Sequence, residues 1–411
     1  MVRAAASGAR ARYGAVLRLP HAKALLLAEI PARAPITILA LATVLFVREH
    51  VGSYLLAGIA AGSLGLAFAV TAPLVGRLID RVGLVAVVIP TTALHTVGVL
   101  ALVACGLWDG PDAGIVAAAV LAGAALPPVG SITRALWPRI IEEGGGRPDL
   151  LSTALAIEGV LIEALFTAGP LFVAAAALLA DPAVALLTAP VLLLIGLAAL
   201  LPLHPVRTWR TAGPDHGHGA LGALRSRGIR VLMLCILPLG FCFGAVEVTL
   251  PAFAEEQETR ALGGVLIAAW SLGSVLGGLV YGAVDWKGPL ARRYAILASL
   301  VPLGFLPLLL TPSFALMGLL VWIAGLSVAP VLTAGNQVVG DVAARGTETE
   351  AYTWPTTALV TGVAAGNAVA GGLVTHSSVE AALAASAGAA LTAALLAWAL
   401  WPGMRPISVP G

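Results

Sequence analysis

Acidic and basic side chains occur within long apolar stretches of this chain, where they could carry protons or bind a polar group. An ionisable group at bilayer depth is costly unless it is paired or hydrated, so such residues are functional candidates. If all of those in the first half are ionised, three carboxylates face two guanidinium groups, and one carboxylate lacks a full counter-charge. They are Glu29, Arg33, Arg134, Glu158 and Glu163.

Glu163 is the first candidate for a proton carrier. From the helical rise, Glu163 and Arg33 lie roughly 14 to 18 Å from the predicted cytoplasmic helix ends, nearer the membrane centre than the other three. A carboxylate with an incomplete counter-charge in a poorly solvated cavity can bind a proton and release it as the cavity opens to each side in turn.

Structural interpretations of the same charges stay open. Glu29 and Arg33 lie four residues apart and can neutralise each other on one helix face. Arg134 and Glu158, near the cytoplasmic helix ends, can form an ion pair that only holds the helices or an inner gate together. Glu163 can serve as a structural partner of Arg33.

Polar residues in the second half are further candidates. Glu247 is a deep acid with no basic residue at its depth, which suits either an outer proton site or a hydrated rim. Asn336 and Asn367 can hydrogen-bond a substrate or bond across helices.

Apolar stretches long enough to cross a bilayer must position these residues. A spanning helix needs about 20 mostly apolar residues, because the hydrocarbon offers the backbone no water to bond with. The chain is 59% hydrophobic and 11% charged, whereas soluble domains carry about 25% charged residues, so a soluble fold is excluded. The twelve stretches are residues 22–48, 54–76, 84–107, 113–137, 151–177, 181–203, 229–254, 260–283, 294–312, 313–341, 350–375 and 378–402.

Basic residues fall almost wholly in every second gap between the stretches. Positively charged loops stay cytoplasmic, so we expect a multi-pass protein of the cell membrane with both termini in the cytoplasm. The polar, glycine-containing gap 204–228 suits a cytoplasmic linker between two six-helix bundles, residues 1–203 with a basic tail and residues 229–411. The formal net charge of +2 gives no sign of a nucleic-acid partner.

The two halves share short sequences at a common spacing, which favours a duplicated six-helix unit, a usual way to build a transporter. This alignment places Arg134 opposite Asn336 and Glu163 opposite Asn367. The matched segments are Ala122-Gly123 with Ala324-Gly325, Pro128-Val129 with Pro330-Val331, Thr153-Ala154-Leu155 with Thr357-Ala358-Leu359, and Asp80-x-x-Gly83 with Asp285-x-x-Gly288.

The gap after the second stretch resembles the cytoplasmic loop signature of the major facilitator superfamily. Gly76 is followed four residues on by Asp80, then by the basic Arg81 and a second glycine, Gly83. Glycines allow a tight turn, and Asp80 can face a helix N-terminus or a basic partner when an inner gate closes. In the fifth stretch, Gly169-Pro170 resembles the centre of a motif seen in antiporter members.

The resemblance implies an all-α membrane fold of twelve helices in two pseudo-symmetric bundles. It also implies a monomer, with the first, fourth and fifth spans lying side by side around a central cavity. We therefore predict a secondary active transporter that exports a small organic or drug-like molecule by alternating access, coupled to protons. Proton-coupled uptake of a small metabolite is an alternative, since the same carboxylate serves either direction. A membrane sensor without net flux is another.

The sequence contains no motif for ATP binding or for the common hydrolase reactions. The absence of G-x-x-x-x-G-K-[ST] gives no support for ATP use, and the absence of H-E-x-x-H and G-x-S-x-G argues against an enzyme. We expect no cofactor and no metal, because His204, His216 and His218 fall in the linker, where a flexible tether supplies no fixed geometry.

Overall fold

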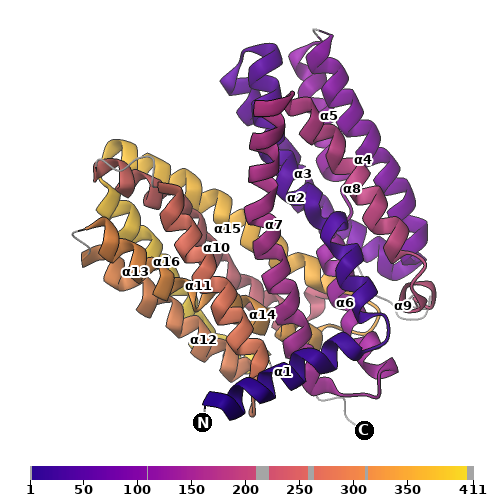
Figure 1. Ribbon diagram of the computed structural model, residues 1–411, viewed down its shortest axis with the longest axis vertical. Helices are drawn as coiled ribbons and strands as arrows, with labels where there is room; N and C mark the ends of the chain where they lie inside the picture. The colour runs from indigo at the N-terminus through magenta and orange to yellow at the C-terminus, as the bar shows by residue number, and fades with distance from the viewer. Residues whose placement is uncertain (1, 109, 210–221, 258–262, 311–312, 405–411) are drawn as a thin grey trace.

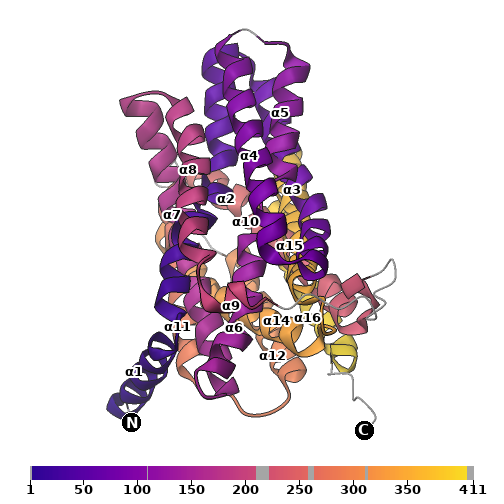
Figure 2. The same cartoon turned by 90° about the vertical axis from the view of Figure 1, so that its right-hand side faces the viewer.

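Two helical bundles form the protein, and they meet at one end and diverge toward the other (Figure 1). The computed structural model describes residues 2–108, 110–209, 222–257, 263–310 and 313–404. Helix α1 lies across the end where the bundles meet, which we call the predicted cytoplasmic end (Figure 1). In the view turned by 90°, α1 again lies at this lower end of the molecule (Figure 2). The linker histidines His216 and His218 lie outside the described residues.

The N-terminal half contains nine α-helices and one short 3-10 helix among its described residues. Long helices dominate because a backbone in hydrocarbon must satisfy its own hydrogen bonds. The elements are α1 (Val2–Arg18), α2 (Ala22–Val51), α3 (Tyr54–Val82), α4 (Leu84–Leu107), α5 (Asp112–Ala124), α6 (Val129–Glu143), η1 (Pro148–Leu150), α7 (Leu151–Leu179), α8 (Pro182–Leu200) and α9 (His204–Arg207).

The C-terminal half repeats this pattern from residue 222 onward. Its described elements are η2 (Gly222–Arg225), α10 (Arg227–Glu256), α11 (Gly263–Ala283), α12 (Leu290–Phe305), η4 (Leu306–Leu310), α13 (Phe314–Gly325), α14 (Val328–Val342), α15 (Glu348–His376), α16 (Val379–Leu400) and η5 (Trp401–Met404).

Twelve segments in the described part of the chain are long and apolar enough to cross a membrane, which confirms the predicted spans in number and order. Their outer faces carry large apolar side chains, and Leu178 and Leu179 of α7 expose 85% and 82% of their surface. Water would not tolerate so much exposed apolar surface, but lipid does. The protein is therefore a multi-pass membrane protein.

The fourth and tenth spans are each interrupted by a break in the helix. The fourth is divided between α5 and α6 by residues 125–128, and the tenth between α13 and α14 by residues 326–327. Proline lacks an N–H group and interrupts a helix ladder. Pro128 is the residue before α6, and Pro330 lies in the first turn of α14, so the two breaks occur at matched positions of the halves.

Equivalent glycines bring equivalent helices together in the two halves. A Cβ at Gly123 of α5 would meet the carbonyl oxygen of Leu64 in α3, and one at Gly325 of α13 would meet that of Trp270 in α11. Only a residue without a side chain allows so close an approach. These crossings confirm the predicted pseudo-symmetric fold, whereas the exact domain boundaries stay a prediction.

Candidate substrate and proton site

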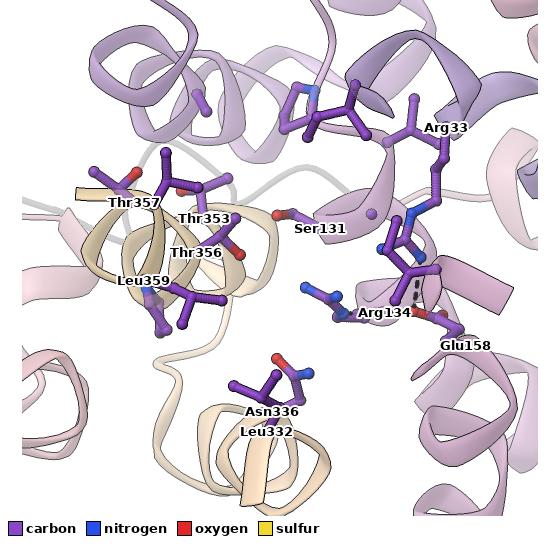
Figure 3. Close-up of a pocket in the computed structure, with 18 of the residues that line it drawn as sticks. Arg33, Ser131, Arg134, Glu158, Leu332, Asn336, Thr353, Thr356, Thr357 and Leu359 are labelled. Carbon is purple, nitrogen blue, oxygen red and sulfur yellow. Dashed lines mark hydrogen bonds and ion pairs between the residues drawn. The ribbon is translucent and has the colours of Figure 1, made fainter. Parts of the chain in front are cut away.

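A cavity of about 260 Å³ lies between the two halves, next to the break between α5 and α6 (Figure 3). Its walls come from α2, α3, α6 and α7 on one side and from α10, α14 and α15 on the other. Apolar side chains form much of the lining, including Ile36, Phe68, Leu126, Phe166 and Ile236. The polar lining residues are Arg33, Ser131, Arg134, Glu158, Glu163, Thr333, Asn336, Thr353, Thr356 and Thr357.

Four of the predicted ionisable residues form one buried cluster at the cavity wall. Nη1 of Arg33 in α2 contacts Glu29 one helical turn earlier and lies 3.4 Å from Oε2 of Glu158 in α7. Nε of Arg134 in α6 lies 3.4 Å from the same Glu158 oxygen. The spans that the resemblance placed side by side do meet here, and the two acids and two bases balance each other.

Neutral side chains donate further hydrogen bonds to the two acids. The Thr133 hydroxyl donates to Oε1 of Glu29 at 3.1 Å, and Nε1 of Trp137 donates to Oε1 of Glu158. Both donors come from α6, so this helix contacts α2 and α7 through the cluster. A buried ion pair needs such additional hydrogen bonds to offset its desolvation.

Glu163 lies outside this cluster and makes a contact of a different kind. Its Oε1 accepts a hydrogen bond of 2.9 Å from the hydroxyl of Ser274 in α11, which belongs to the opposite half. Among the described residues no basic side chain forms an ion pair with Glu163, and Arg33 contacts Glu29 and Glu158 instead. Glu163 is therefore the cavity acid without a counter-charge in the described structure.

The remaining predicted residues divide between the cavity and the opposite end. Asn336 lines the cavity, and its amide group points toward the side chain of Arg134 (Figure 3). Glu247 of α10 and Asn367 of α15 do not line it but lie within hydrogen-bonding reach of each other. Asn336 thus lines the cavity, whereas Glu247 lies outside the lining but close enough to Glu163 for their charges to interact.

Gly130 is a cavity residue for which the sequence predicted no role. A Cβ at this position would lie 2.9 Å from Nη2 and 3.1 Å from Cζ of Arg33. The helix break at Pro127 and Pro128 places the first turn of α6, which contains Gly130, against the guanidinium group of Arg33. Two consecutive prolines followed closely by a glycine, within an apolar span, were the signal that could have found it.

The predicted loop signature lies at the junction of the two halves. Oδ1 and Oδ2 of Asp80, at the end of α3, accept hydrogen bonds from the backbone N–H groups of Thr349 and Glu350, at 3.1 and 2.9 Å. These N–H groups belong to the first turn of α15, where a carboxylate is favoured by the unpaired donors and the helix dipole. Asp80 therefore joins α3 of one half to α15 of the other.

Neighbouring residues strengthen the same junction. Arg77 forms a two-pronged ion pair with Glu350, with Nη2 2.7 Å from Oε1 and Nε 3.1 Å from Oε2. A Cβ at Gly76 would lie 3.1 Å from the Glu350 backbone, so this glycine permits the close approach. Gly83 has a φ of 102° at the turn into α4, whereas Arg81 is exposed.

Comparison with known proteins agrees with this architecture. The profile of the Major Facilitator Superfamily matches residues 25–301, more than half of the chain. The chain belongs to the major facilitator superfamily. This confirms the predicted resemblance and makes the protein a member of a family of membrane transporters. No curated protein sequence matches the chain.

Solved structures of other superfamily transporters share the fold. The human organic anion transporter MFSD10 (TETRAN) is 19% identical, with a TM-score of 0.69, over 94% of this chain and 99% of that one. A bacterial homologue of the iron transporter ferroportin in an outward-facing state is 13% identical, with a TM-score of 0.74, over 92% of this chain and 98% of that one. At these identities the likeness shows the fold alone.

In this superfamily member, α1 adds a second junction between the halves. Arg12 of α1 lies 3.6 Å from Oδ2 of Asp149, before α7, and 3.4 Å from Oδ1 of Asp285, after α11. The Tyr13 hydroxyl donates to the carbonyl oxygen of Leu279 in α11 at 2.7 Å, and burial raises the pKa of Tyr13 to about 12. The segment before the first span therefore contacts both halves.

The motif Gly169-Pro170 has a more local position. Gly169 is buried in α7, where a Cβ would clash with the side chain of Thr37 in α2 of the same half. Pro170 is the next residue of the same helix. These residues shape the packing of α7 on α2, and neither is among the residues that line the cavity.

Proposed function

We propose that the protein is a proton-coupled secondary transporter that exports a small organic molecule by alternating access, with Glu163 as the proton carrier. The observation that supports this best is the hydrogen bond from Ser274 to Glu163. It places an acid without a basic partner in the cavity wall, on a contact that joins the two halves. A proton on Glu163 changes this contact, so protonation and movement of the halves are linked.

The charges around the cavity favour exchange of a proton for the substrate. With every group ionised, Glu29, Glu158 and Glu163 outnumber Arg33 and Arg134 by one negative charge. A proton on Glu163 cancels that charge. A cationic substrate is therefore accepted more readily when Glu163 is ionised, and a proton displaces it, which is the requirement for antiport.

The cavity itself favours a small and moderately apolar substrate. Its volume of about 260 Å³ lies just below the range of about 300–1,000 Å³ typical of ligand sites. Apolar walls supply contact area, while Asn336, Ser131 and the threonines of α15 offer hydrogen bonds that orient the molecule. No cofactor or enzymatic step is part of this mechanism.

Alternating access requires that the junctions at the predicted cytoplasmic end open and close. Asp80, Arg77 and Glu350 hold one junction, and Arg12 holds the other, while the bundles diverge at the opposite end (Figure 1). We infer that this arrangement corresponds to an outward-facing state, with both termini in the cytoplasm. Breaking these contacts, and forming new ones at the far end, would open the cavity to the cytoplasm.

The test is transport by the purified protein in proteoliposomes under an imposed pH gradient. Ethidium serves as the cationic probe and pyranine reports the internal pH. We expect ethidium movement driven by the gradient, with proton movement in the opposite direction, and loss of both in Glu163→Gln. Glu49→Gln is the matched control, because Glu49 is an exposed acid at the far end of α2.

Other outcomes distinguish the alternatives. Movement of probe and protons in the same direction would indicate uptake by symport. Binding of the probe, measured by thermal shift, without any counterflow would indicate a sensor. Transport that ignores the gradient, or that persists unchanged in Glu163→Gln, would overturn the assignment of Glu163.

A further inference from the structure

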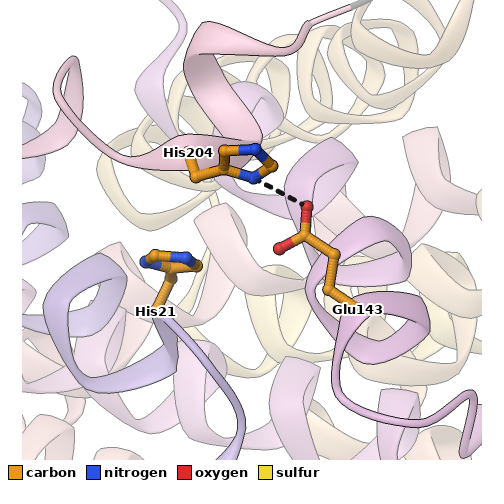
Figure 4. Close-up of side chains that lie close together, drawn as sticks. All are labelled: His21, Glu143 and His204. Carbon is orange, nitrogen blue, oxygen red and sulfur yellow. Dashed lines mark hydrogen bonds and ion pairs between the residues drawn. The ribbon is translucent and has the colours of Figure 1, made fainter.

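A group of side chains that the transport proposal does not use lies at the predicted cytoplasmic end of the N-terminal half. His21 stands between α1 and α2, Glu143 is the last residue of α6, and His204 is the first residue of α9. One ligand atom from each lies within 4.8 Å of the other two (Figure 4). Nδ1 of His204 is 3.3 Å from Oε1 of Glu143.

Two imidazoles and one carboxylate are a ligand set that suits zinc. Zinc binds His nitrogen at about 2.0–2.1 Å and carboxylate oxygen at about 2.0–2.2 Å, and it accepts three protein ligands with water as the fourth. In such a tetrahedron the ligand atoms lie about 3.4 Å apart. The separation of 3.3 Å between His204 and Glu143 is already close to that value, and none of the three separations exceeds 4.8 Å.

The backbone holds the three residues in place. His21 has a φ of 62°, a left-handed conformation that is uncommon for a residue with a side chain. Its carbonyl oxygen accepts the N–H of Leu25 in the first turn of α2, at 2.8 Å. A Cβ at Gly144, the residue after Glu143, would meet Leu19 and Pro20, so the end of α6 packs directly on the elbow between α1 and α2.

The side chains remain open to an ion from solution. The side chain of His204 is 64% exposed and that of Glu143 is 32% exposed. The rings of His21 and His204 lie nearly parallel, at an interplanar angle of 21° with centroids 6.3 Å apart. In the described part of the chain, the His21 ring has no hydrogen-bond partner.

We propose that His21, Glu143 and His204 bind one Zn²⁺ ion, with water completing the tetrahedron. From the sequence we expected no metal, because His204 falls in the predicted flexible linker, whereas the structure holds His204 in α9. The bound ion ties α9 and the elbow before α2 to the end of α6. It therefore fastens the start of the connection between the halves to the N-terminal half. This site is separate from the cavity, so its failure would leave the transport proposal untouched.

The experiment uses the full chain in detergent, purified without a polyhistidine tag. His216→Ala and His218→Ala are introduced together in the parent protein, because that His-x-His sequence would compete for metal. Zn²⁺ is titrated calorimetrically, and Co²⁺ is added separately so that its visible absorption reports tetrahedral coordination. We expect one Zn²⁺ per chain, a tetrahedral Co²⁺ spectrum and a higher unfolding temperature with Zn²⁺.

Three variants and one control test the ligands. His21→Asn keeps a residue that tolerates the left-handed backbone but removes the imidazole. His204→Ala and Glu143→Gln remove the other two ligands. Each variant should bind Zn²⁺ at least about tenfold more weakly, and His376→Ala, an exposed histidine at the end of α15, should not.

Gel filtration separates a lost ligand from a lost fold. A variant that elutes as the parent does and still binds one Zn²⁺ with parental affinity would overturn the proposal. So would a parent that binds no Zn²⁺, or one whose Co²⁺ spectrum is octahedral.

Discussion

Gly130 of α6 lies directly against the guanidinium group of Arg33 in α2, and a Cβ at position 130 would come within 2.9 Å of Nη2. The contact is tight because Arg33 also reaches Glu29 and Glu158, which leaves its side chain little freedom. The buried charge cluster therefore depends on a residue that carries no charge.

Gly130→Ala should displace Arg33 from its two acids. We expect a loss of stability of about 1–3 kcal/mol, as for overpacking in a filled interior, together with reduced transport. Thermal unfolding in detergent measures the first effect. Gly58→Ala in α3 is the control, because a Cβ there meets no atom within 4 Å. Equal unfolding temperatures for the two variants would show that the contact with Arg33 is relaxed in solution.

Ser274→Ala removes the donor that joins Glu163 to the opposite half. A hydrogen bond to a charged group contributes about 1.5–3 kcal/mol, so we expect transport to slow by about tenfold or more. The pH profile of transport should also change. Ser63→Ala in α3 is the matched control, because Ser63 does not line the cavity. An unchanged rate and profile in Ser274→Ala would argue that this bond does not couple protonation to movement.

Asp80→Asn should weaken the junction at the predicted cytoplasmic end. An amide offers one acceptor oxygen where the carboxylate offers two, and it lacks the charge that favours a helix N-terminus. We expect the fraction of molecules with this junction open to rise about tenfold. Such a rise corresponds to a change of about 1.4 kcal/mol in the free-energy difference between the open and closed states. Pulsed electron–electron double resonance measures the change as the distance distribution between two spin labels. The labels are attached to cysteines that replace Glu142 and Lys287, in a protein without its native cysteines.

The control for that experiment is Asp112→Asn. Asp112 is an exposed acid in the first turn of α5, within a single half. A distance distribution in Asp80→Asn that matches both the parent and this control would contradict a role for Asp80 in closing the junction.

Tyr13 predicts a pH dependence for the attachment of α1. Its pKa is raised to about 12 by burial, against about 10 for an exposed tyrosine. Only the neutral form donates to Leu279, so the stabilisation is fully present below pH 10 and is lost as the pH rises through about 12. Cleavage of α1 by an alkaline protease such as subtilisin, which remains active at this pH, should accelerate over that interval in the parent.

Tyr13→Phe should be cleaved faster than the parent at neutral pH. Its cleavage rate should lack the additional rise between pH 10 and 12. A difference absorbance titration of the parent against Tyr13→Phe measures the same group directly. A difference titration centred near pH 10 would contradict the burial of this hydroxyl.

The fold could be predicted from the sequence to a large extent. Hydropathy alone located the spans, because each segment must by itself be apolar enough to lie in the hydrocarbon of the bilayer. The loop from Gly76 to Gly83 indicated the superfamily. The breaks near Pro128 and Pro330 were missed, because prolines are frequent in these spans and most of them, such as Pro31 and Pro35 in α2, leave their helix unbroken.

The candidate site was predictable only in part. The types of residue indicated that buried acids would face buried arginines, and an excess of one carboxylate followed from counting. The pairing of Arg33 with Glu158, and the placement of Glu247 and Asn367 away from the cavity, depend on how each helix is rotated about its axis. Rotation is set by packing against neighbours that are distant in the sequence, so no local pattern encodes it.

The sequence by itself determined that this chain crosses the membrane many times and carries more acids than bases among its deep charges in the first half. Only the tertiary structure decided that Glu163 contacts Ser274, 111 residues away and in the other half, and that Asp80 reaches the first turn of α15. The physical reason is that burial of apolar residues in lipid is a property of each segment. Partnership between polar groups depends instead on the angles and distances between helices, which exist only once the bundles are packed.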